Sequence, residues 1–591
     1  MKNALISFAT TIFALQASLL NAAQANRPNV VLIITDDQGY GDIAAHGHPF
    51  VKTPNLDTLH KSSVRLSNFH VMPLCAPTRA MLMTGKNPLE SGVWATVLGR
   101  SILPPDAVTM PQIFSENGYA TGMFGKWHLG DNAPARPQDK GFQTAVYLGG
   151  GGIGQTPDYW GNDYIDDTYY KNGNPVQASG YCTDFFFREA MSFMKENREK
   201  PFLTYIATNA PHAPYIPPPD LAKAYRDIPG IDNPTAAFYA MIENIDTNLG
   251  RLIGFLKENR LEENTILIFM TDNGTAQGLK APGAFNAGMR ASKGALYEGG
   301  HRVPCFIRWP GGQLPQKGGT DVADLTSGID ILPTLAGLCG LQLKGDQKNQ
   351  IKGVDLSPRL RGNEMQSLAE RFHFVQFSQE DNPPAKNRAA VMQGDWRLVN
   401  GNELFNVKTD QGQKQNIIEM HPQKAAEMAK AHEEWYKKVA PSVKKMNPIW
   451  VGSPLENPVR LNAMDWHTGS NPGNLAWNQP AIRRGMKSSG FWAIDVRQAG
   501  NYQIRLRRWP AESKMKFTDK SGNQPQADIT QARLSIGRQQ TTTSVNSSSE
   551  FVEFQIKLNS GQTELKADFL DASGNTLFGA YYVELTWVKS R

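Results

Sequence analysis

The sequence predicts an α/β fold with a mainly parallel sheet flanked by helices, and two observations lead to this prediction. Residues 30–34 and 265–270 form apolar runs, which are typical of strands buried on both faces. Similar runs follow at residues 119–124, 202–207 and 305–307. Residues 236–258, in contrast, place apolar side chains at helical spacing. Strands that alternate with helices predict an α/β domain whose sheet is mainly parallel.

The composition of the chain changes along its length. With 591 residues, 40% of them hydrophobic and 20% charged, the chain is long enough for two or three globular domains. A stretch rich in Pro, Asn and Trp before residue 480 indicates a linker. We expect a targeting segment over residues 1–25, an α/β domain over 26–365 and a small antiparallel sheet with one helix over 366–445. A linker over 446–480 and a β-sandwich-like module over 481–591 should follow.

Alternating side chains predict the β-sandwich-like module. Apolar and polar residues alternate over 502–506 and again over 554–558, which is typical of strands with one buried face. The aromatic side chains of this module could bind sugar rings. Cross-strand packing is the interpretation that we favour, because strand aromatics pair in this way in most sheets.

Residues 1–25 have the pattern of a cleavable signal peptide. Lys2 is their only charged residue, an apolar stretch covers residues 4–20, and Ala23-Gln24-Ala25 gives a cleavage site. We therefore expect cleavage after Ala25, a periplasmic or secreted protein, and no membrane attachment of the mature chain.

The charge of the chain argues against one class of partner. The formal net charge of +6 is modest for this length, and the sequence has no block of Lys and Arg residues. Because nucleic-acid-binding proteins carry such a block or a basic stripe, we expect no nucleic-acid partner.

Polar side chains follow two of the predicted strands. Asp36 and Asp37 come directly after the run at 30–34, and Asp272 and Asn273 come after the run at 265–270. The carboxyl ends of parallel strands meet at one edge of a sheet, where ligands bind. Oxygen ligands select a hard cation such as calcium or magnesium. The alternative, that these residues only begin turns, explains one strand better than two.

Basic side chains follow other predicted strands. Lys126 and His128 come after the run at 119–124, and His212 follows the run at 202–207 between two prolines. Lys293 precedes the strand predicted at 305–307. A single Lys is usually solvated and a single His usually structural, but several at separate strand ends favour a common site.

A glycine-rich segment lies between these groups. Residues 149–154 are mostly glycine and are followed by Tyr159 and Trp160. Such a segment predicts a loop, which could form the wall of a pocket. It is not a phosphate-binding loop, because the Lys-Ser/Thr pair of such loops is missing.

The stretch from Leu74 to Gly85 predicts a helix that begins at a reactive side chain. Pro77 suits the first turn of a helix, residues 78–84 continue it, and Gly85 can end it. Cys75 would then lie just before the helix N-terminus, where the unpaired N–H groups favour an anion or an oxygen nucleophile. Arg79, one turn later, could reach back to the same point.

The pattern Cys75-x-Pro77-x-Arg79 followed by Thr84-Gly85 resembles the signature of the type I, formylglycine-dependent sulfatases of the alkaline phosphatase superfamily. Thr78 stands where that family usually has serine. The resemblance extends over about residues 27–440 and implies an alkaline-phosphatase-like fold. It also implies that a maturation enzyme oxidises Cys75 to formylglycine (3-oxoalanine).

The resemblance assigns roles to the residues named above. It implies catalytic roles for Cys75, Arg79, Lys126, His128, His212, Asp272 and Lys293. It implies that one calcium ion is bound by Asp36, Asp37, Asp272, Asn273 and the oxygen that replaces the Cys75 sulfur.

In the implied mechanism, Asp272 accepts a proton from the attacking hydroxyl, while Arg79 and Lys126 stabilise the hydrate and the bound sulfate. His212 and Lys293 protonate the leaving alcohol, and His128 takes the second hydroxyl's proton so that sulfate is released.

We therefore expect an exported sulfuric ester hydrolase that acts on a sulfated polysaccharide or oligosaccharide. A phosphodiester or phosphonate monoester hydrolase of the same superfamily, and a non-catalytic glycan-binding protein, remain alternatives. If Cys75 is modified, Cys182, Cys305 and Cys339 allow at most one disulfide, and the sequence leaves the pairing open.

Overall fold

The computed structural model describes residues 27–277, 281–315, 319–469, 474–521 and 527–589. The expected signal peptide lies outside these residues. Among the described helices, none combines the length and the apolar character that crossing a bilayer requires.

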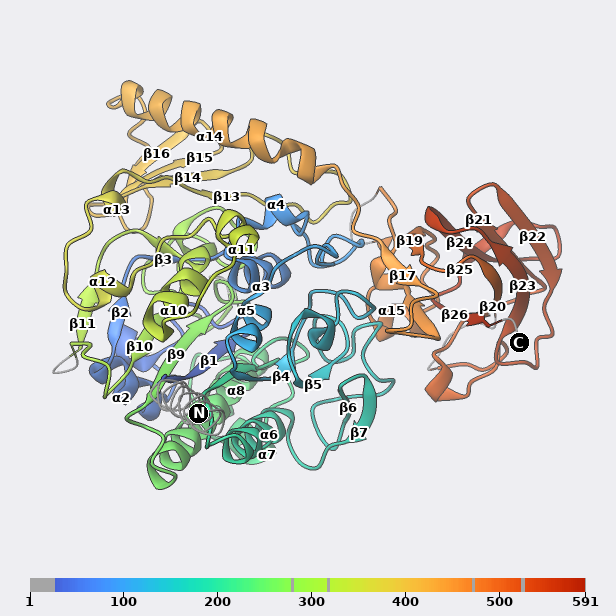
Figure 1. Ribbon diagram of the computed structural model, residues 1–591, viewed down its shortest axis with the longest axis horizontal. Helices are drawn as coiled ribbons and strands as arrows, with labels where there is room; N and C mark the ends of the chain where they lie inside the picture. Colours follow the sequence, from blue (N-terminus) through green and yellow to red (C-terminus); the bar gives the residue numbers. More distant parts are fainter. Residues whose placement is uncertain (1–26, 278–280, 316–318, 470–473, 522–526, 590–591) are drawn as a thin grey trace, which may run out of the picture.

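A ten-stranded sheet organises the first domain, in the order β11-β2-β10-β9-β1-β8-β4-β5-β6-β7 (Figure 1). The central strands β9 to β5 run parallel to one another, which confirms the predicted mainly parallel sheet. The strand predicted at 305–307 is antiparallel to both of its neighbours. The strands are β11 (Thr320–Val322), β2 (Val64–Leu66), β10 (Cys305–Arg308), β9 (Thr265–Thr271), β1 (Asn29–Thr35), β8 (Phe202–Ala207), β4 (Ala120–Lys126), β5 (Thr144–Leu148), β6 (Thr168–Lys171) and β7 (Asn174–Gln177).

Helices cover both faces of this sheet, as the apolar runs predict. In β1, Val31 and Ile33 pack on one face, with α2 (Pro54–Ser62), α6 (Cys182–Glu196) and α8 (Asn233–Glu258). Val30, Leu32 and Ile34 pack on the other face, with α3 (Cys75–Thr84), α5 (Met110–Glu116) and α10 (Ile331–Cys339). Every residue of β1 is buried, so apolar and polar side chains do not alternate along this strand.

Shorter elements connect the core to its surroundings. They are η1 (Ala44–His46), β3 (Phe69–His70), α4 (Pro88–Ser91), η2 (Pro137–Lys140), α7 (Pro219–Arg226), α9 (Glu298–His301), β12 (Thr326–Ser327), η3 (Gly328–Asp330), α11 (Gly345–Gln350), α12 (Ser357–Leu360) and α13 (Ser367–Glu370). Strand β3 pairs with β12 just before the segment that carries Cys75.

The small antiparallel subdomain has the predicted composition of one sheet and one helix. Its strands are β13 (His373–Val375), β14 (Ala390–Gln393), β15 (Trp396–Val399) and β16 (Glu403–Asn406), each antiparallel to the next. Helix α14 (Pro422–Val443) covers one face of this sheet through Ala425 and Met428. In Figure 1 it forms the yellow and orange layer above the main sheet.

The C-terminal module packs two sheets against each other and lies at the far end of the long axis (Figure 1). One sheet has β17 (Ile449–Val451), β19 (Phe491–Val496), β24 (Gly561–Leu570), β21 (Gln531–Ile536) and β22 (Gln539–Ser544), with β25 (Thr576–Gly579) paired to β24. The other sheet has β18 (Val459–Asn462), β26 (Tyr582–Val588), β20 (Gly500–Arg507) and β23 (Val552–Leu558). Trp466, Trp492, Trp509, Phe569 and Tyr581 are buried in its core.

The segment expected to be a linker, residues 446–480, differs from that expectation. It supplies β17, β18, η4 (Ala463–Asp465) and the start of α15 (Gln479–Arg483). Its composition resembles that of a linker, but its tryptophan at 466 is fully buried and anchors the segment to the module. A short η6 (Ala511–Ser513) follows β20 in the same module.

Candidate active site

Helix α3 presents Cys75 at its first turn, and all ten of its residues are buried. The helix begins at Cys75 itself, two residues earlier than predicted, because proline is tolerated throughout the first turn. Gly85 ends it in the left-handed conformation, with φ 62°, as predicted. The hydroxyl of Thr78 donates to the carbonyl of Met72 (2.9 Å), which folds the preceding loop over the helix start.

Arg79 contacts the site through a carboxylate rather than by reaching back over its own helix. Its Nη2 and Nε donate to Oδ2 of Asp272 at 2.8 and 3.2 Å, and its Nη1 donates to the carbonyl of Lys126 (2.8 Å). Neither side chain of this ion pair is exposed to solvent. The pair therefore ties α3 to the ends of β9 and β4.

The predicted metal ligands meet at the carboxyl ends of β1 and β9. These strands are paired in register, with Thr35 opposite Thr271, so the residues that follow them are neighbours. Ligand atoms of Asp36, Cys75 and Asp272 all lie within 4.8 Å of one another.

Asp37 joins this group through a left-handed turn, with φ 64°. Its N–H donates to Oδ1 of Asp272 (3.1 Å), and its Oδ1 accepts from Nδ2 of Asn273 (2.9 Å). All four predicted ligand residues of the two strand ends therefore lie in one cluster.

The chemistry of this cluster fits a hard cation. Asp36 Oδ1 and Asn273 Oδ1 are buried, and neither has a hydrogen-bond partner among the described residues. A buried oxygen without a donor is costly, whereas a divalent cation would satisfy both atoms at once. Because Asp36, Asp37, Asp272 and Asn273 offer only oxygen, these four residues favour calcium or magnesium over softer metals.

Two lysines place positive charge on the same carboxylates. Lys126 Nζ lies 2.5 Å from Asp36 Oδ2, and Lys293 Nζ lies 2.5 Å from Asp37 Oδ1. Burial acts to raise the pKa of Asp37, but Lys293 and His212 outweigh it and hold this pKa below its usual value. Burial and the charge of Asp36 raise the pKa of Asp272 to about 6, against the opposing effect of Arg79.

The two histidines lie on loops beside this cluster. His128 has φ 59°, and its Nε2 lies 2.8 Å from the carbonyl of Thr96, so this nitrogen carries the proton and donates. Its Nδ1 is then an acceptor, and it is buried without a partner among the described residues. His212 Nδ1 donates to the carbonyl of Ala213 (2.6 Å), and its Nε2 lies 3.9 Å from Asp37 Oδ2.

Burial keeps both imidazoles neutral. It lowers the pKa of His128 far below the usual value, and the charge of Lys126 acts in the same direction. It also lowers the pKa of His212 to about 4, although Asp37 opposes this. His128 Nδ1 is therefore available as a proton acceptor near neutral pH.

The glycine-rich loop, residues 149–161, forms the wall next to these histidines. A Cβ atom at Gly151 would overlap the imidazole ring of His128, and one at Gly152 would lie 3.2 Å from Nδ1 of His212. The predicted pocket wall is thus in contact with one histidine and adjacent to the other. Only glycine leaves room for the His128 ring at this distance.

Several residues of the site gave no signal in the sequence. Thr96 orients His128 through a backbone carbonyl, which no motif reveals. A pocket beside Lys293 is lined by Leu74, Gly294, Phe377, Gln379, Glu380 and Arg388. Most of these side chains come from the loop between β13 and β14, and loops of this kind have no periodic pattern.

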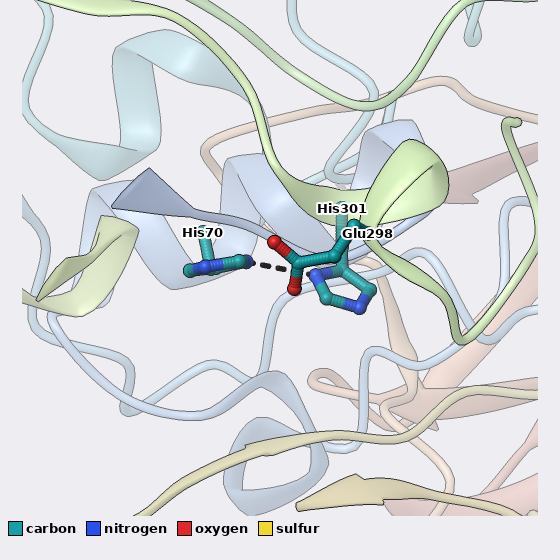
Figure 2. A group of neighbouring side chains, drawn as sticks. All are labelled: His70, Glu298 and His301. Carbon is teal, nitrogen blue, oxygen red and sulfur yellow. Dashed lines mark hydrogen bonds between the residues drawn. The ribbon is translucent and has the colours of Figure 1, made fainter. Parts of the chain in front are cut away.

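A second cluster of possible metal ligands lies nearby, formed by His70, Glu298 and His301 (Figure 2). His70 comes from β3, while the other two come from α9. The Nδ1 atoms of the two histidines are 2.9 Å apart and share a hydrogen bond. Arg397 Nε donates to Oε1 of Glu298 at 2.8 Å. A guanidinium therefore already neutralises this carboxylate.

The four cysteines are buried and free in the structure, so no disulfide links Cys182, Cys305 or Cys339. Burial raises the pKa of Cys75 to about 11, to which Asp36 and Asp272 contribute against the two lysines. As an unmodified thiol, Cys75 would be protonated and a poor nucleophile at neutral pH.

Comparison with known proteins places this geometry in a family. The sulfatase family model matches residues 28–341. Arylsulfatase A of Homo sapiens is 32% identical over 393 residues, covering 62% of this chain and 74% of its own length. N-acetylgalactosamine-6-sulfatase of Canis lupus familiaris is 30% identical over 383 residues, covering 60% of this chain and 70% of its own.

The solved structure of Ps i-CgsB in complex with k-i-k-neocarrahexaose gives the same result. It superimposes with a TM-score of 0.63 at 29% identity, over 71% of this chain and 95% of that one. The fold, the matched region and these relatives agree, and the chain belongs to the sulfatase family of hydrolases.

Proposed function

We propose that this sulfatase removes sulfate from a sulfated carbohydrate, using formylglycine made from Cys75 and one calcium ion. The observation that carries the proposal is the meeting of Asp36, Cys75 and Asp272 within 4.8 Å, beside buried oxygens that lack donors. The carbohydrate is supported by two similar proteins, an N-acetylgalactosamine-6-sulfatase and a structure that holds neocarrahexaose.

The raised pKa of the Cys75 thiol, about 11, supports the modification, since the unmodified side chain is unsuited to attack. Formylglycine, as its hydrate, supplies one hydroxyl for attack at sulfur and a second through which sulfate can be expelled. Calcium, when bound by Asp36, Asp37, Asp272 and Asn273, supplies a Lewis acid beside the nucleophile.

The chain's own basic groups would bind the anionic substrate. A sulfate monoester carries one negative charge, and the ammonium groups of Lys126 and Lys293 lie 2.5 Å from the carboxylates of Asp36 and Asp37. Arg79 holds the carboxylate of Asp272 in a fixed orientation from the opposite side. Asp272, whose pKa is raised to about 6 by burial and by the charge of Asp36, would accept the proton of the nucleophile.

The remaining groups would move protons on the leaving side. Lys293 is held in its protonated form, because Asp37 outweighs the effect of burial and raises its pKa. Lys293 would donate a proton to the departing alcohol, and His212 would share this role once its Nε2 takes up a proton in the presence of the anionic substrate. His128 Nδ1, the acceptor without a partner, would take the proton that allows sulfate to leave.

The proposal is tested by measuring sulfate release from a panel of defined sulfated oligosaccharides and an aryl sulfate. The protein used carries formylglycine verified by mass spectrometry, and the Cys75→Ala protein is the control. No release from any substrate by the modified protein would refute the proposal. Faster turnover of an aryl phosphonate monoester than of the matching aryl sulfate would instead assign a phosphonate hydrolase.

We also propose that the protein is exported, on the basis of the pattern in residues 1–25. N-terminal sequencing of the native mature protein should then begin at Asn26. A mature chain that still carries Met1 would contradict export by cleavage.

A further inference from the structure

The glycine-rich loop beside the histidines is bound on its outer side by the C-terminal β module. Thr156 N donates to the carbonyl of Trp477 (3.0 Å), and its hydroxyl donates to the carbonyl of Ala476 (2.6 Å). Tyr582 of β26 donates its hydroxyl to the carbonyl of Thr156 (3.2 Å). Trp160 packs edge to face on Trp509, with ring centroids 5.6 Å apart.

Gln479, the first residue of α15, makes the most extensive contact with this loop. Its N–H donates to the carbonyl of Gly154 (2.9 Å), and its Oε1 accepts from the N–H of Gly161 (3.1 Å). Its Nε2 lies 3.2 Å from the carbonyls of Asp158 and Tyr159. Since the side chain is buried, these bonds are shielded from water and fix the loop at both ends.

A second contact joins the module to Asp381, in the loop between β13 and β14. His467 Nδ1 lies 2.9 Å from Oδ1 of Asp381, and the N–H of Gly469 donates to Oδ2 of the same carboxylate (3.1 Å). Arg100 Nε also donates to Asp381 (2.9 Å). Gly99 packs so closely on the His467 ring that a Cβ atom there would overlap it.

The second contact is adjacent to the residues that orient His128. Gln379, two residues before Asp381, accepts from the N–H of Thr96 at 3.1 Å, and its Nε2 donates to the Thr96 hydroxyl at 3.0 Å. Thr96 in turn holds Nε2 of His128 through its carbonyl. The module therefore contacts His128 indirectly from two directions, through Gly151 and through Thr96.

The module itself is poorly suited to an independent role in glycan binding. Most of its large aromatic side chains, including Trp466, Trp492 and Trp509, are buried in its own core rather than displayed on a strand face. The family model ends at residue 341, before the module begins. The module residues that contact the active-site loops thus lie beyond the matched region.

We propose that the C-terminal β module contributes to the active site by holding His128 in position. Gln479 and His467 are the positioning residues. The inference rests on the proposed function only for what His128 does, and not for the contacts themselves. Small displacements of a catalytic group cost large factors in rate, so losing either contact should slow the reaction even though neither residue touches substrate.

The test compares Gln479→Ala and His467→Ala in the full chain with the matched control Gln503→Ala, a half-buried side chain on β20 of the same module that bonds to Glu553 at the surface. Two properties are measured. The first is kcat and KM with a small aryl sulfate and with a sulfated polysaccharide, and the second is hydrogen exchange in peptides covering residues 94–100 and 149–161. His467→Asn, which keeps a donor for Asp381, is the conservative variant.

We expect kcat to fall about tenfold or more in Gln479→Ala and His467→Ala, with KM changed less than about twofold. His467→Asn should recover part of the loss, and Gln503→Ala should match the wild type. Hydrogen exchange should become faster in the peptides covering residues 149–161 for Gln479→Ala, and in those covering residues 94–100 for His467→Ala.

An unchanged kcat and unchanged exchange in both variants would overturn the proposal. So would a loss that appears only with a polymeric substrate and only in KM, since that would assign the module to glycan binding. Because exchange is measured without substrate, it tests the contacts even if the protein hydrolyses no sulfate ester. If His467→Ala fails to fold, Gln479→Ala decides the outcome alone.

Discussion

Two buried clusters in this protein have the geometry of metal sites, but they differ in whether hydrogen bonds and ion pairs satisfy all of their carboxylate oxygens. In the cluster of His70, Glu298 and His301, the two histidines bond to each other, and Arg397 and Arg302 take one carboxylate oxygen each, at 2.8 and 3.3 Å. In the cluster of Asp36, Cys75 and Asp272, Lys126 pairs with Oδ2 of Asp36, and Oδ1 of the same carboxylate is buried without a partner among the described residues. The first set is complete without an ion, and the second is not.

This difference teaches that ligand proximity alone does not define a metal site. In both clusters the ligand atoms lie within 4.8 Å of one another, yet only a count of donors and acceptors separates them. An arginine pairs with a carboxylate in each cluster, Arg397 with Glu298 and Arg79 with Asp272, so the feature that separates them is the buried Asp36 Oδ1, which has no partner among the described residues. The cluster of Figure 2 thus has a structural role, in which it holds α9, β3 and β15 together.

The largest expected effect tests whether Cys75, in the cluster with Asp36 and Asp272, carries the nucleophile. Cys75→Ala should abolish sulfate release, with a loss of at least about 1000-fold, because the nucleophile is removed. Its thermal unfolding should stay close to that of the wild type. Cys305→Ala, which removes an equally buried thiol from β10, is the matched control and should keep full activity. Comparable activity in the two variants would refute the assignment.

The second prediction concerns metal content. The wild type should bind one calcium ion, and Asp36→Asn should weaken calcium binding and activity by about 100-fold or more, since it removes a ligand charge. Glu298→Gln should retain the ion. Isothermal titration with calcium, after treatment with a chelator, measures calcium binding by both variants, and sulfate release measures their activity. Loss of calcium from Glu298→Gln but not from Asp36→Asn would reverse the interpretation of the two clusters.

The third prediction concerns stability. Glu298→Gln should lower the free energy of unfolding by about 3–5 kcal/mol, because it leaves Arg397 buried without its partner. Glu553→Gln removes a solvent-exposed pair with Arg505 on the β module and should cost less than about 1 kcal/mol. Denaturant unfolding followed by fluorescence compares them. Equally small losses of unfolding free energy in the two variants would show that the pair of Glu298 and Arg397 does not hold these elements together.

The smallest effect is a change in pH dependence. Burial lowers the pKa of His301 to about 4, although Glu298 opposes this. As the pH falls below the unfolded value of 6.5, the unfolded chain binds a proton that the folded chain does not, so unfolding becomes easier. Between pH 6.5 and 5 this group should cost the wild type about 1–2 kcal/mol.

His301→Gln lacks this titration and can still bond to His70. Its free energy of unfolding should therefore fall less than that of the wild type between pH 6.5 and 5. Parallel pH profiles of the two proteins would contradict the buried, neutral state of His301.

Most of the strand ends that form the site could be predicted from the sequence. The apolar runs before Asp36 and Asp272 require buried parallel strands, and such strands must bring their carboxyl ends to one edge. The start of α3 at Cys75 was displaced from the prediction because proline fits any position of the first turn. This error is local and does not move the Cys75 side chain out of the site.

The contacts of Thr96, Asp381 and His467 could not be predicted, because they join segments far apart in the chain through loops. The carbonyl of Thr96 acts on His128 without any side-chain signal, and His467 reaches Asp381 across 86 residues. The segment around Trp466 has the composition of a linker, and only tertiary packing makes it part of the module.

The most direct measurement relates the modification of Cys75 to the rate of sulfate release. Protein is prepared with different fractions of Cys75 converted to formylglycine, by varying the amount of maturation enzyme during expression, and mass spectrometry quantifies each fraction. The rate per chain should rise in proportion to that fraction and extrapolate to zero for the thiol form. A rate that is independent of the fraction, or no release from fully converted protein, would contradict the account.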